Sequence, residues 1–204
     1  MSNYLSVAET AKLIRASLRE SFPGVKFSVR SSSYAGGASI RVGWVDGPTT
    51  AAVEAVAHPW QGSYFDGMQD YKGSRYHTLD GEPVRFGADF VFCEREETHA
   101  VLARAARLVA KKYMGLDLSD DAALQLSHLF REGELWEVMP NVDAWSDHWN
   151  LQSLIRRMAA KITDTPFPQP SKTLQRLTQC GDDGYHSGQY LSQSEAMRQQ
   201  IHAI

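Results

Sequence analysis

Apolar and polar positions repeat with a helical period at the start of the chain. From Val7 to Leu18 the apolar residues recur at three- and four-residue steps, as on one face of an amphipathic helix. Ser6 and Glu9 have the spacing of a capping box, which predicts that the helix begins at Ser6. The Pro-Gly pair at 23–24 predicts its end.

The period then changes to two, which predicts strands. Apolar residues alternate with polar ones from Val25 to Val29, and the alternation resumes after the sequence SSSYAGG, from Ala38 to Trp44. We expect one face of each strand to be buried. A short helix is predicted from Thr49 or Thr50, and the His58-Pro59 pair predicts its end.

A second hairpin is predicted around the Asp80-Gly81 pair, with strands over 75–79 and 85–94. The period of two places an apolar row on one face of the second strand, and we expect it in the core: Phe86, Ala88, Phe90 and Phe92. A helix over 98–113 follows and ends at Gly115. The order α-β-β-α-β-β-α predicts an α+β fold, with an antiparallel sheet of three or four strands, helices on one face and a helical C-terminal extension.

Three segments are predicted: an α+β domain over 1–115, a helical appendage over 116–163 and a polar tail over 164–204. The appendage has helical patterns after Ser119 and from Leu151 to Met158. We expect its tryptophans to join it to the sheet domain: Trp136, Trp145 and Trp149. The tail is rich in Pro, Gln, Ser and Gly, which predicts a mobile linker ending in a short helix.

Charge and cysteine content indicate which ligands and which cellular compartment suit the chain. Lys and Arg number 21 against 24 Asp and Glu, a formal charge of -3, so the chain lacks the cationic excess of non-specific phosphate binders. Cys93 and Cys180 lie far apart in different contexts, which favours free thiols in a reducing compartment. No signal peptide or membrane-spanning run is evident, so we expect a cytoplasmic protein without membrane association.

Two loops contain candidate binding residues. The first runs from Arg30 to Gly37 and offers amides and hydroxyls to an anion, but a strand rather than a helix follows its glycines, so a hairpin loop is favoured. The second runs from Tyr64 to Tyr71. Its Asp66 and Asp70 have oxygens that suit Mg²⁺, yet an ordinary Asp-Gly turn also explains Asp66. We favour a partner surface there, because aromatic and Met side chains are enriched at interfaces.

No catalytic set, metal site or cofactor motif is predicted. The seven histidines lack zinc-site spacing, and the serines at 31–33 lack a nucleophile elbow. Nucleic-acid binding is an alternative, because basic residues and tyrosines are interleaved along the strands: Arg30, Arg41, Lys72 and Arg75. The outer positions of any antiparallel sheet are also polar, which is the plainer interpretation.

Three stretches resemble the twenty-ninth family of large polyvalent protein-associated domains: VRSSSYAGGASIRVGWVDGP, FDGMQDYKGSRY and PVRFGADFVFCERE. The resemblance covers approximately residues 5–115. Such domains occur in phages and conjugative plasmids, so it implies a mobile-element origin and no defined reaction. The predicted partner-binding positions are Ser33, Tyr34, Gly36, Gly37, Asp46, Phe65, Asp66, Gly67, Met68, Asp70 and Tyr71.

The leading hypothesis is a non-catalytic protein that binds and inhibits a host defence complex, as anti-CRISPR and antirestriction proteins do. Its partner is then a host protein or nucleoprotein. The alternative is a nucleic-acid-binding module that acts in conjugation or phage DNA entry. A third hypothesis, an enzyme, requires another acidic residue beside Asp66 and Asp70. A homodimer is left open, because an edge strand and the appendage each offer a contact.

Overall fold

The computed structural model describes residues 3–140, 150–165 and 167–184. The strands are β1 (Asn3–Leu5), β2 (Ser28–Tyr34), β3 (Gly37–Val45), β4 (Ser63–Asp66), β5 (Tyr71–Leu79), β6 (Glu82–Phe86), β7 (Phe90–Glu96) and β8 (Leu177–Asp182). The helices are α1 (Val7–Ser21), α2 (Thr50–Ala57), η1 (His58–Trp60), α3 (His99–Val109), η2 (Ala110–Met114), α4 (Asp120–Glu132), α5 (Leu151–Ala159) and α6 (Lys172–Gln175).

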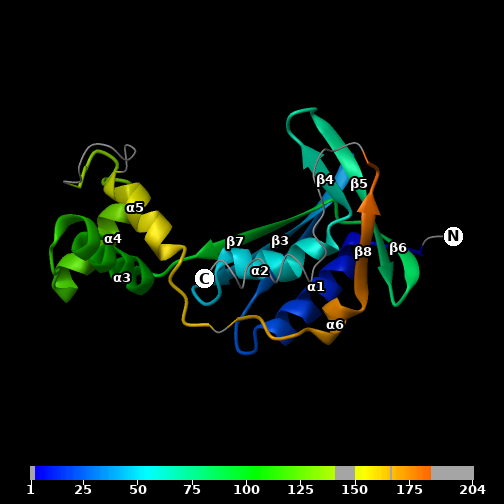
Figure 1. Cartoon of the computed structure of the whole chain (residues 1–204), viewed down its shortest axis with the longest axis horizontal. Helices are drawn as coiled ribbons and strands as arrows, with labels where there is room; N and C mark the ends of the chain where they lie inside the picture. Colours follow the sequence, from blue (N-terminus) through cyan, green and yellow to red (C-terminus); the bar gives the residue numbers. More distant parts are fainter. Residues whose placement is uncertain (1–2, 141–149, 166, 185–204) are drawn as a thin grey trace. The chain divides into compact units, whose positions relative to one another are not determined.

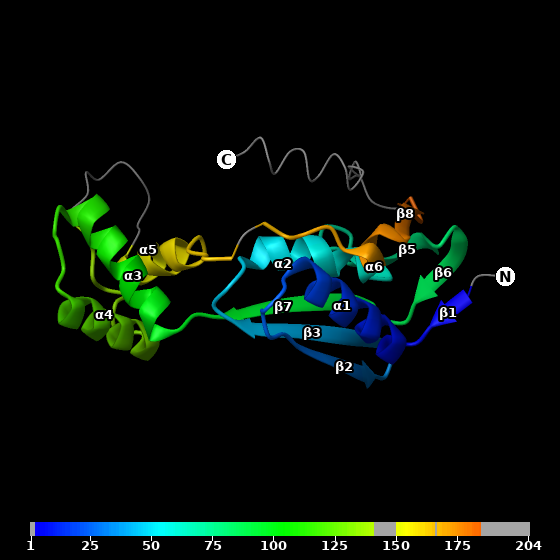
Figure 2. The same ribbon diagram turned by 90° about the horizontal axis from the view of Figure 1, so that it is seen from below.

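The strands form two mixed sheets. The first has the order β1-β6-β5-β4, with β8 also paired to β5, and β1 runs parallel to β6 while its other pairs are antiparallel. The second has the order β2-β3-β7, and β3 and β7 point the same way (Figure 2). The α+β class is confirmed, but the expectation of one antiparallel sheet is wrong.

Gly87 explains why the predicted strand 85–94 is divided between the two sheets. Its amide donates to the carbonyl of Leu5 at 2.7 Å, and a Cβ there would lie 2.9 Å from that oxygen and from the amide nitrogen of Val7. Only glycine lets the N-terminal segment pass so closely. The predicted apolar row is therefore split: Phe86 and Ala88 are buried, while Phe90 is half-buried and Phe92 is 47% exposed.

The core beneath the three-stranded sheet follows the sequence pattern. The capping box is present, because the Ser6 amide donates to Glu9 Oε2 at 2.8 Å and the Glu9 amide donates to Ser6 Oγ at 3.3 Å. Ile14 and Leu18 of α1 are fully buried, as are Ile40 and Val42 of β3. Figure 2 shows α1 and α2 on the same face of this sheet.

The C-terminal segment departs from the expected mobile linker. It forms α6 and then β8, which lies beside β5 (Figure 1). Glu20 of α1 holds its start, because it accepts hydrogen bonds from Ser171 Oγ at 2.7 Å and from the Thr173 amide at 2.9 Å. The predicted terminal helix lies outside the described residues.

The chain divides into two compact units. The first contains the described residues up to Val42, Glu54–Cys93 and those from Pro168 onward, and the second contains Gly43–Val53 and the described residues from Glu94 to Phe167. The boundaries predicted at 115 and 163 stay predictions. In the second unit α3 and α5 contribute buried residues to one core, among them Leu102, Val109 and Ile155.

The prediction that tryptophans join the appendage to the sheet domain stays a prediction, and only Trp136 of the three lies among the described residues. Trp136 is 47% exposed, and the guanidinium of Arg156 lies 5.3 Å from the centre of its ring. Trp145 and Trp149 lie outside the described residues. Among the described helices, none is both long and apolar enough to cross a bilayer.

Candidate functional site

Asp89 connects the two loops that the sequence analysis singled out. Its Oδ2 accepts a hydrogen bond from the Ala38 amide at 3.1 Å, just after the β2–β3 turn, and its Oδ1 accepts one from Ser63 Oγ at 3.0 Å on β4. The backbone of Asp89 repeats the connection, since its amide donates to the Ala38 carbonyl at 2.8 Å. One carboxylate therefore fixes the end of one hairpin against the base of the other.

Lys72 completes this connection from β5. Its Nζ lies 3.0 Å from Asp89 Oδ2 and 3.5 Å from the carbonyl oxygen of Gly36. Gly37 is required at this place, because a Cβ there would collide with Asp89 Oδ2 and touch the ring of Tyr34 at 3.1 Å. Gly36 has a φ of 90°, as a tight hairpin turn requires, whereas Gly37 begins β3. Gly36 thus permits the turn, and Gly37 leaves room for the side chain of Asp89.

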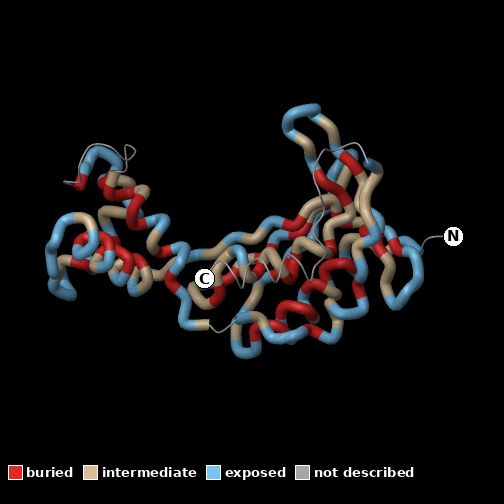
Figure 3. Tube along the Cα trace, viewed as in Figure 1, coloured by how far each residue is buried: buried red, intermediate tan, exposed pale blue. Residues whose placement is uncertain are grey.

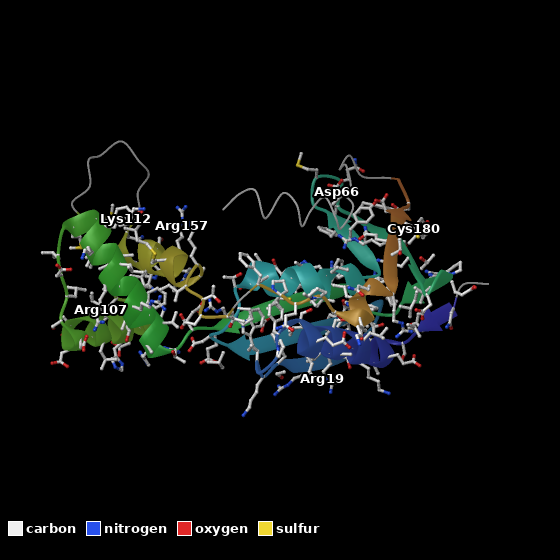
Figure 4. The ribbon with its side chains drawn as sticks, turned by 60° about the horizontal axis from the view of Figure 1, so that its bottom comes forward. Arg19, Asp66, Arg107, Lys112, Arg157 and Cys180 are labelled. Atoms are coloured by element: carbon white, nitrogen blue, oxygen red, sulfur yellow. The ribbon has the colours of Figure 1, made fainter. Side chains whose placement is uncertain are left out.

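Above this base lies a surface of exposed aromatic and Met side chains, the hairpin-end surface. We define it as Tyr34, Gly36, Gly37, Phe65, Asp66, Gly67, Met68, Asp70, Lys72 and Asp89. Tyr34 is 53% exposed, Phe65 is 57% exposed and Met68 is 96% exposed. The exposed tip between β4 and β5 is visible in Figure 3, and Asp66 is labelled at it in Figure 4.

The tip of the β4–β5 hairpin has an internally bonded shape. Asp66 Oδ1 accepts the Met68 amide at 2.9 Å, and the Asp66 carbonyl accepts the Gln69 amide at 3.3 Å. Asp70 has a φ of 48°, a left-handed conformation that Asp tolerates better than most residues. The turn chemistry expected of Asp66 is therefore present.

The other side of this hairpin is held by a residue that the sequence analysis did not single out. Asp183 accepts hydrogen bonds from the hydroxyls of Tyr64 at 2.5 Å and Tyr71 at 3.0 Å, and from the Ser74 amide at 2.8 Å. Burial first, and then Asp183, raise the pKa of the Tyr64 hydroxyl. Tyr71, predicted as a partner residue, thus points its hydroxyl to Asp183 rather than to the exposed tip.

Asp46 lies in a turn of the second unit, where it has a structural role. Its Oδ1 accepts the Thr98 amide and its Oδ2 the Thr98 hydroxyl, each at 2.8 Å, at the start of α3. Asp46 and Gly47 both have positive φ, 50° and 62°. The hydrogen bonds to Thr98 and the turn geometry explain this Asp-Gly pair without a binding partner. Ser33 is exposed on β2.

The four basic residues of the nucleic-acid hypothesis lie on three strands, β2, β3 and β5. Lys72 belongs to the hairpin-end surface, whereas Arg30 and Arg41 are exposed on β2 and β3. Arg75 is half-buried on β5, and its Nε has no hydrogen-bond partner among the described residues. Nucleic-acid binding by these residues stays a prediction.

The thiol and carboxylate positions do not assemble further chemistry in the described part of the chain. Burial, and then the nearby Glu54, raise the pKa of the Cys93 thiol to about 12, which keeps it protonated. The enzyme hypothesis needed a third acid near Asp66 and Asp70. Within the described ranges, no group of three or more His, Cys, Asp and Glu side chains is placed to hold a metal ion.

Comparison with known proteins agrees with the resemblance noted from the sequence. Residues 5–100 match the family model described as Large polyvalent protein associated domain 29. This range contains the whole hairpin-end surface. No curated protein and no solved structure matches the chain. Residues 5–100 are therefore similar to a domain of the polyvalent proteins of phages and other mobile elements.

Proposed function

We propose that the chain is a non-catalytic interaction protein of a mobile genetic element, which binds a host defence complex and inhibits it in the manner of anti-CRISPR and antirestriction proteins. The hairpin-end surface makes the contact. The observation that carries the proposal is the exposure of Phe65 and Met68, 57% and 96%, at the end of a hairpin that Asp89 braces. Large apolar side chains on a pre-arranged surface are typical of the centres of protein interfaces.

The charges beside these side chains indicate the kind of partner. Asp66 and Asp70 flank Met68, while the nearby Lys72 is paired with Asp89. A complementary surface therefore has an apolar pocket with a basic rim. Proteins that handle nucleic acid have basic grooves, and defence complexes are built from such proteins. The tip would enter a groove of this kind.

The functional test measures defence directly. A host with an active CRISPR or restriction system is challenged with phage or plasmid, with and without expression of the chain. Expression should raise the recovery of phage or transformants, and the F65A/M68A double variant should lose this effect. Truncation of two interface anchors that contribute about 2 kcal/mol each should weaken binding several hundredfold, on the order of 4 kcal/mol in total.

Phe167→Ala is the matched control, because it removes another aromatic side chain that is 74% exposed, outside the hairpin-end surface. It should protect as well as the wild type. A photo-crosslinking amino acid at Met68 should capture a component of the same defence system, while one at exposed Lys12 on α1 should not. Unchanged restriction in the presence of the wild-type chain, with no defence component captured from Met68, refutes the proposal.

A further inference from the structure

The charges of the chain are unevenly distributed along its sequence. Residues 1–45 contain six Lys and Arg residues but only two Asp and Glu residues, although the whole chain has a formal charge of -3. Four of the six cations belong to α1 or to the connection between α1 and β2. A basic stretch within an acidic protein is typical of a surface that contacts nucleic acid or another polyanion.

Three of these cations form a row on the exposed side of α1. Lys12, Arg15 and Arg19 are spaced by three and then four residues, so they lie on one stripe of the helix, and all three are exposed. Figure 4 labels Arg19 on this helix. Like charges four residues apart, such as Arg15 and Arg19, weaken a helix, so an anion bound along the row would stabilise it.

The two carboxylates of α1 are bonded to other groups. Glu9 Oε2 accepts hydrogen bonds from the amide and the hydroxyl of Ser6, at 2.8 and 2.6 Å. Glu20 accepts them from Ser171 and Thr173, at the start of α6. Helical spacing puts both acids roughly a quarter turn around the helix from the row. The ion pairs between described residues involve other cations, so no cation of the row is in one.

The row lies beside the free edge of β2. Arg15 Nη2 donates to the Val29 carbonyl at 2.8 Å, and β2 is the first strand of its sheet. Counting back from the two-residue turn at 35–36, the amides of Ser31 and Ser33 point to the same edge as that carbonyl, and both residues are exposed. Lys26 is exposed just before the strand. We call this surface the basic edge and define it as Lys12, Arg15, Arg19, Lys26, Ser31 and Ser33.

We propose that the basic edge binds the phosphate backbone of a nucleic-acid duplex without reading its sequence. The row from Lys12 to Arg19 is about 10 Å long, and one strand of a duplex carries a charge about every 3.4 Å, so the row meets about three phosphates. The hydroxyls and edge amides of Ser31 and Ser33 donate to phosphate oxygens. The basic edge has no aromatic side chain on which an unpaired base stacks, so the duplex, with its higher charge density, is preferred.

Two other polyanions fit this surface less well. A helix that lies in a membrane surface buries its apolar side among lipids, whereas Ile14 and Leu18 of α1 are fully buried in the protein core. An acidic protein would need evenly spaced charges along a straight line, which a duplex has along its whole length. The basic edge shares no residue with the hairpin-end surface, so this site goes beyond the proposed function.

Fluorescence anisotropy of labelled duplex DNA, duplex RNA and a single strand of equal length tests the proposal with the full chain. At low salt we expect a duplex to bind more tightly than the single strand, and the two duplex arms separate a preference for DNA from one for RNA. Duplexes of unrelated sequence should bind equally. With four cations on phosphates, the affinity should fall about a hundredfold between about 50 and 200 mM salt.

The role of single cations has its own variants. Lys12→Ala and Arg19→Ala should each lower the slope of log affinity against log salt by about 0.9, the value for one lost phosphate contact. Arg19→Lys keeps the charge and should keep the slope. Arg85→Ala is the matched control, because it removes an exposed arginine from β6, outside the basic edge, and it should change neither affinity nor slope. Circular dichroism and thermal melting identify any variant that loses affinity by unfolding.

The two proposed sites can be tested apart. The F65A/M68A variant should lose the defence phenotype yet bind the duplex as the wild type does. With purified chain and duplex, a photo-crosslinking amino acid at Lys12 should capture the duplex, while one at Met68 should not.

Three results overturn the basic-edge proposal: a wild type that binds no duplex at low salt, a wild type that prefers the single strand, or an Arg85→Ala variant that weakens binding as much as Arg19→Ala. Vesicles of phosphatidylglycerol provide a further test. If they bind the wild type and the duplex does not, the surface is assigned to membrane contact, which also overturns the proposal.

Discussion

The hydroxyl oxygen of Tyr64 lies 2.5 Å from Oδ1 of Asp183, 119 positions further along the chain. The same carboxylate accepts Tyr71 and the Ser74 amide, so it gathers three donors from β4 and β5. A segment that the sequence predicts to be a mobile linker thus fixes one side of the hairpin whose tip we propose as the partner site.

Asp183→Asn should loosen this attachment. Asparagine turns an N–H₂ group towards groups that are themselves donors, so at least one charge-assisted hydrogen bond is lost. Amide hydrogen exchange in β8 should accelerate on the order of tenfold, the equivalent of one such bond. Asp164→Asn, which removes an exposed ion pair with Arg104, should leave β8 unchanged. Equal exchange in all three proteins contradicts the role given to Asp183.

Gly73→Ala should destabilise the protein, whereas Gly43→Ala should not. A Cβ at Gly73 would collide with the ring of Tyr64, and overpacking of this kind costs about 1–3 kcal/mol. A Cβ at Gly43 would meet only the Glu94 carbonyl oxygen at 3.9 Å, an ordinary contact. Urea denaturation measures both free energies of unfolding. Equal values for the two variants would show that Tyr64 is not packed on Gly73.

His77 should make the protein less stable in mild acid. The side chain is 3% exposed on β5, 5.0 Å from Phe86 between ring centres, and burial first, then Arg75, lower its pKa from 6.5 to about 4. Above pH 6.5 both folded and unfolded chains hold it neutral. Between pH 6.5 and about 4 only the unfolded chain takes up the proton, so the free energy of unfolding falls by about 3 kcal/mol.

Denaturation of wild type and His77→Leu at several pH values checks this prediction. Carboxylates titrate in the same acid range, so the informative quantity is the difference between the two proteins. The free energy of unfolding of the wild type minus that of His77→Leu should decrease as the pH falls below 6.5. A difference that is constant between pH 7.5 and 4.5 contradicts the assignment.

The two thiols should react at very different rates in the folded protein. Cys180 is exposed on β8, while the pKa of Cys93 is raised to about 12 by burial and by Glu54. Because the thiolate is the nucleophile, a maleimide or disulfide reagent at pH 8 should label Cys180 alone. Both should react in denaturant. Rapid labelling of Cys93 in the Cys180→Ser variant under native conditions contradicts its placement.

Local sequence signals predicted the first half of the fold well, because the interactions are local. Ser6 and Glu9 are three residues apart, and alternation around Ile40 needs only the neighbouring positions. The sheet arrangement was not predictable in this way. β6 and β7 belong to different sheets because the chain turns at Gly87, whose amide donates to the carbonyl of Leu5. These two residues are far apart in sequence.

The same distinction applies to the candidate site. The glycine pair at 36–37 and the aromatic tip were visible as loop composition, and the structure brings them together. Asp89, the residue that joins them, sits between Ala88 and Phe90 in a run that looks like one continuous strand. Asp89 contacts Ala38, Ser63 and Lys72, which lie on three other segments. A single sequence contains no signal for contacts between residues so far apart. Phe92, expected in the core, is instead 47% exposed on β7.

The pairing of β8 with β5 bears on how the chain matures during synthesis. Cys180 and Thr78, close neighbours across these strands, are 102 positions apart. While the ribosome is still adding those residues, one edge of the nascent β5 presents unpaired amides and carbonyls. Such an edge recruits foreign strands, so the interval before Leu177 emerges is the time at which this protein is most exposed to aggregation and most dependent on chaperones.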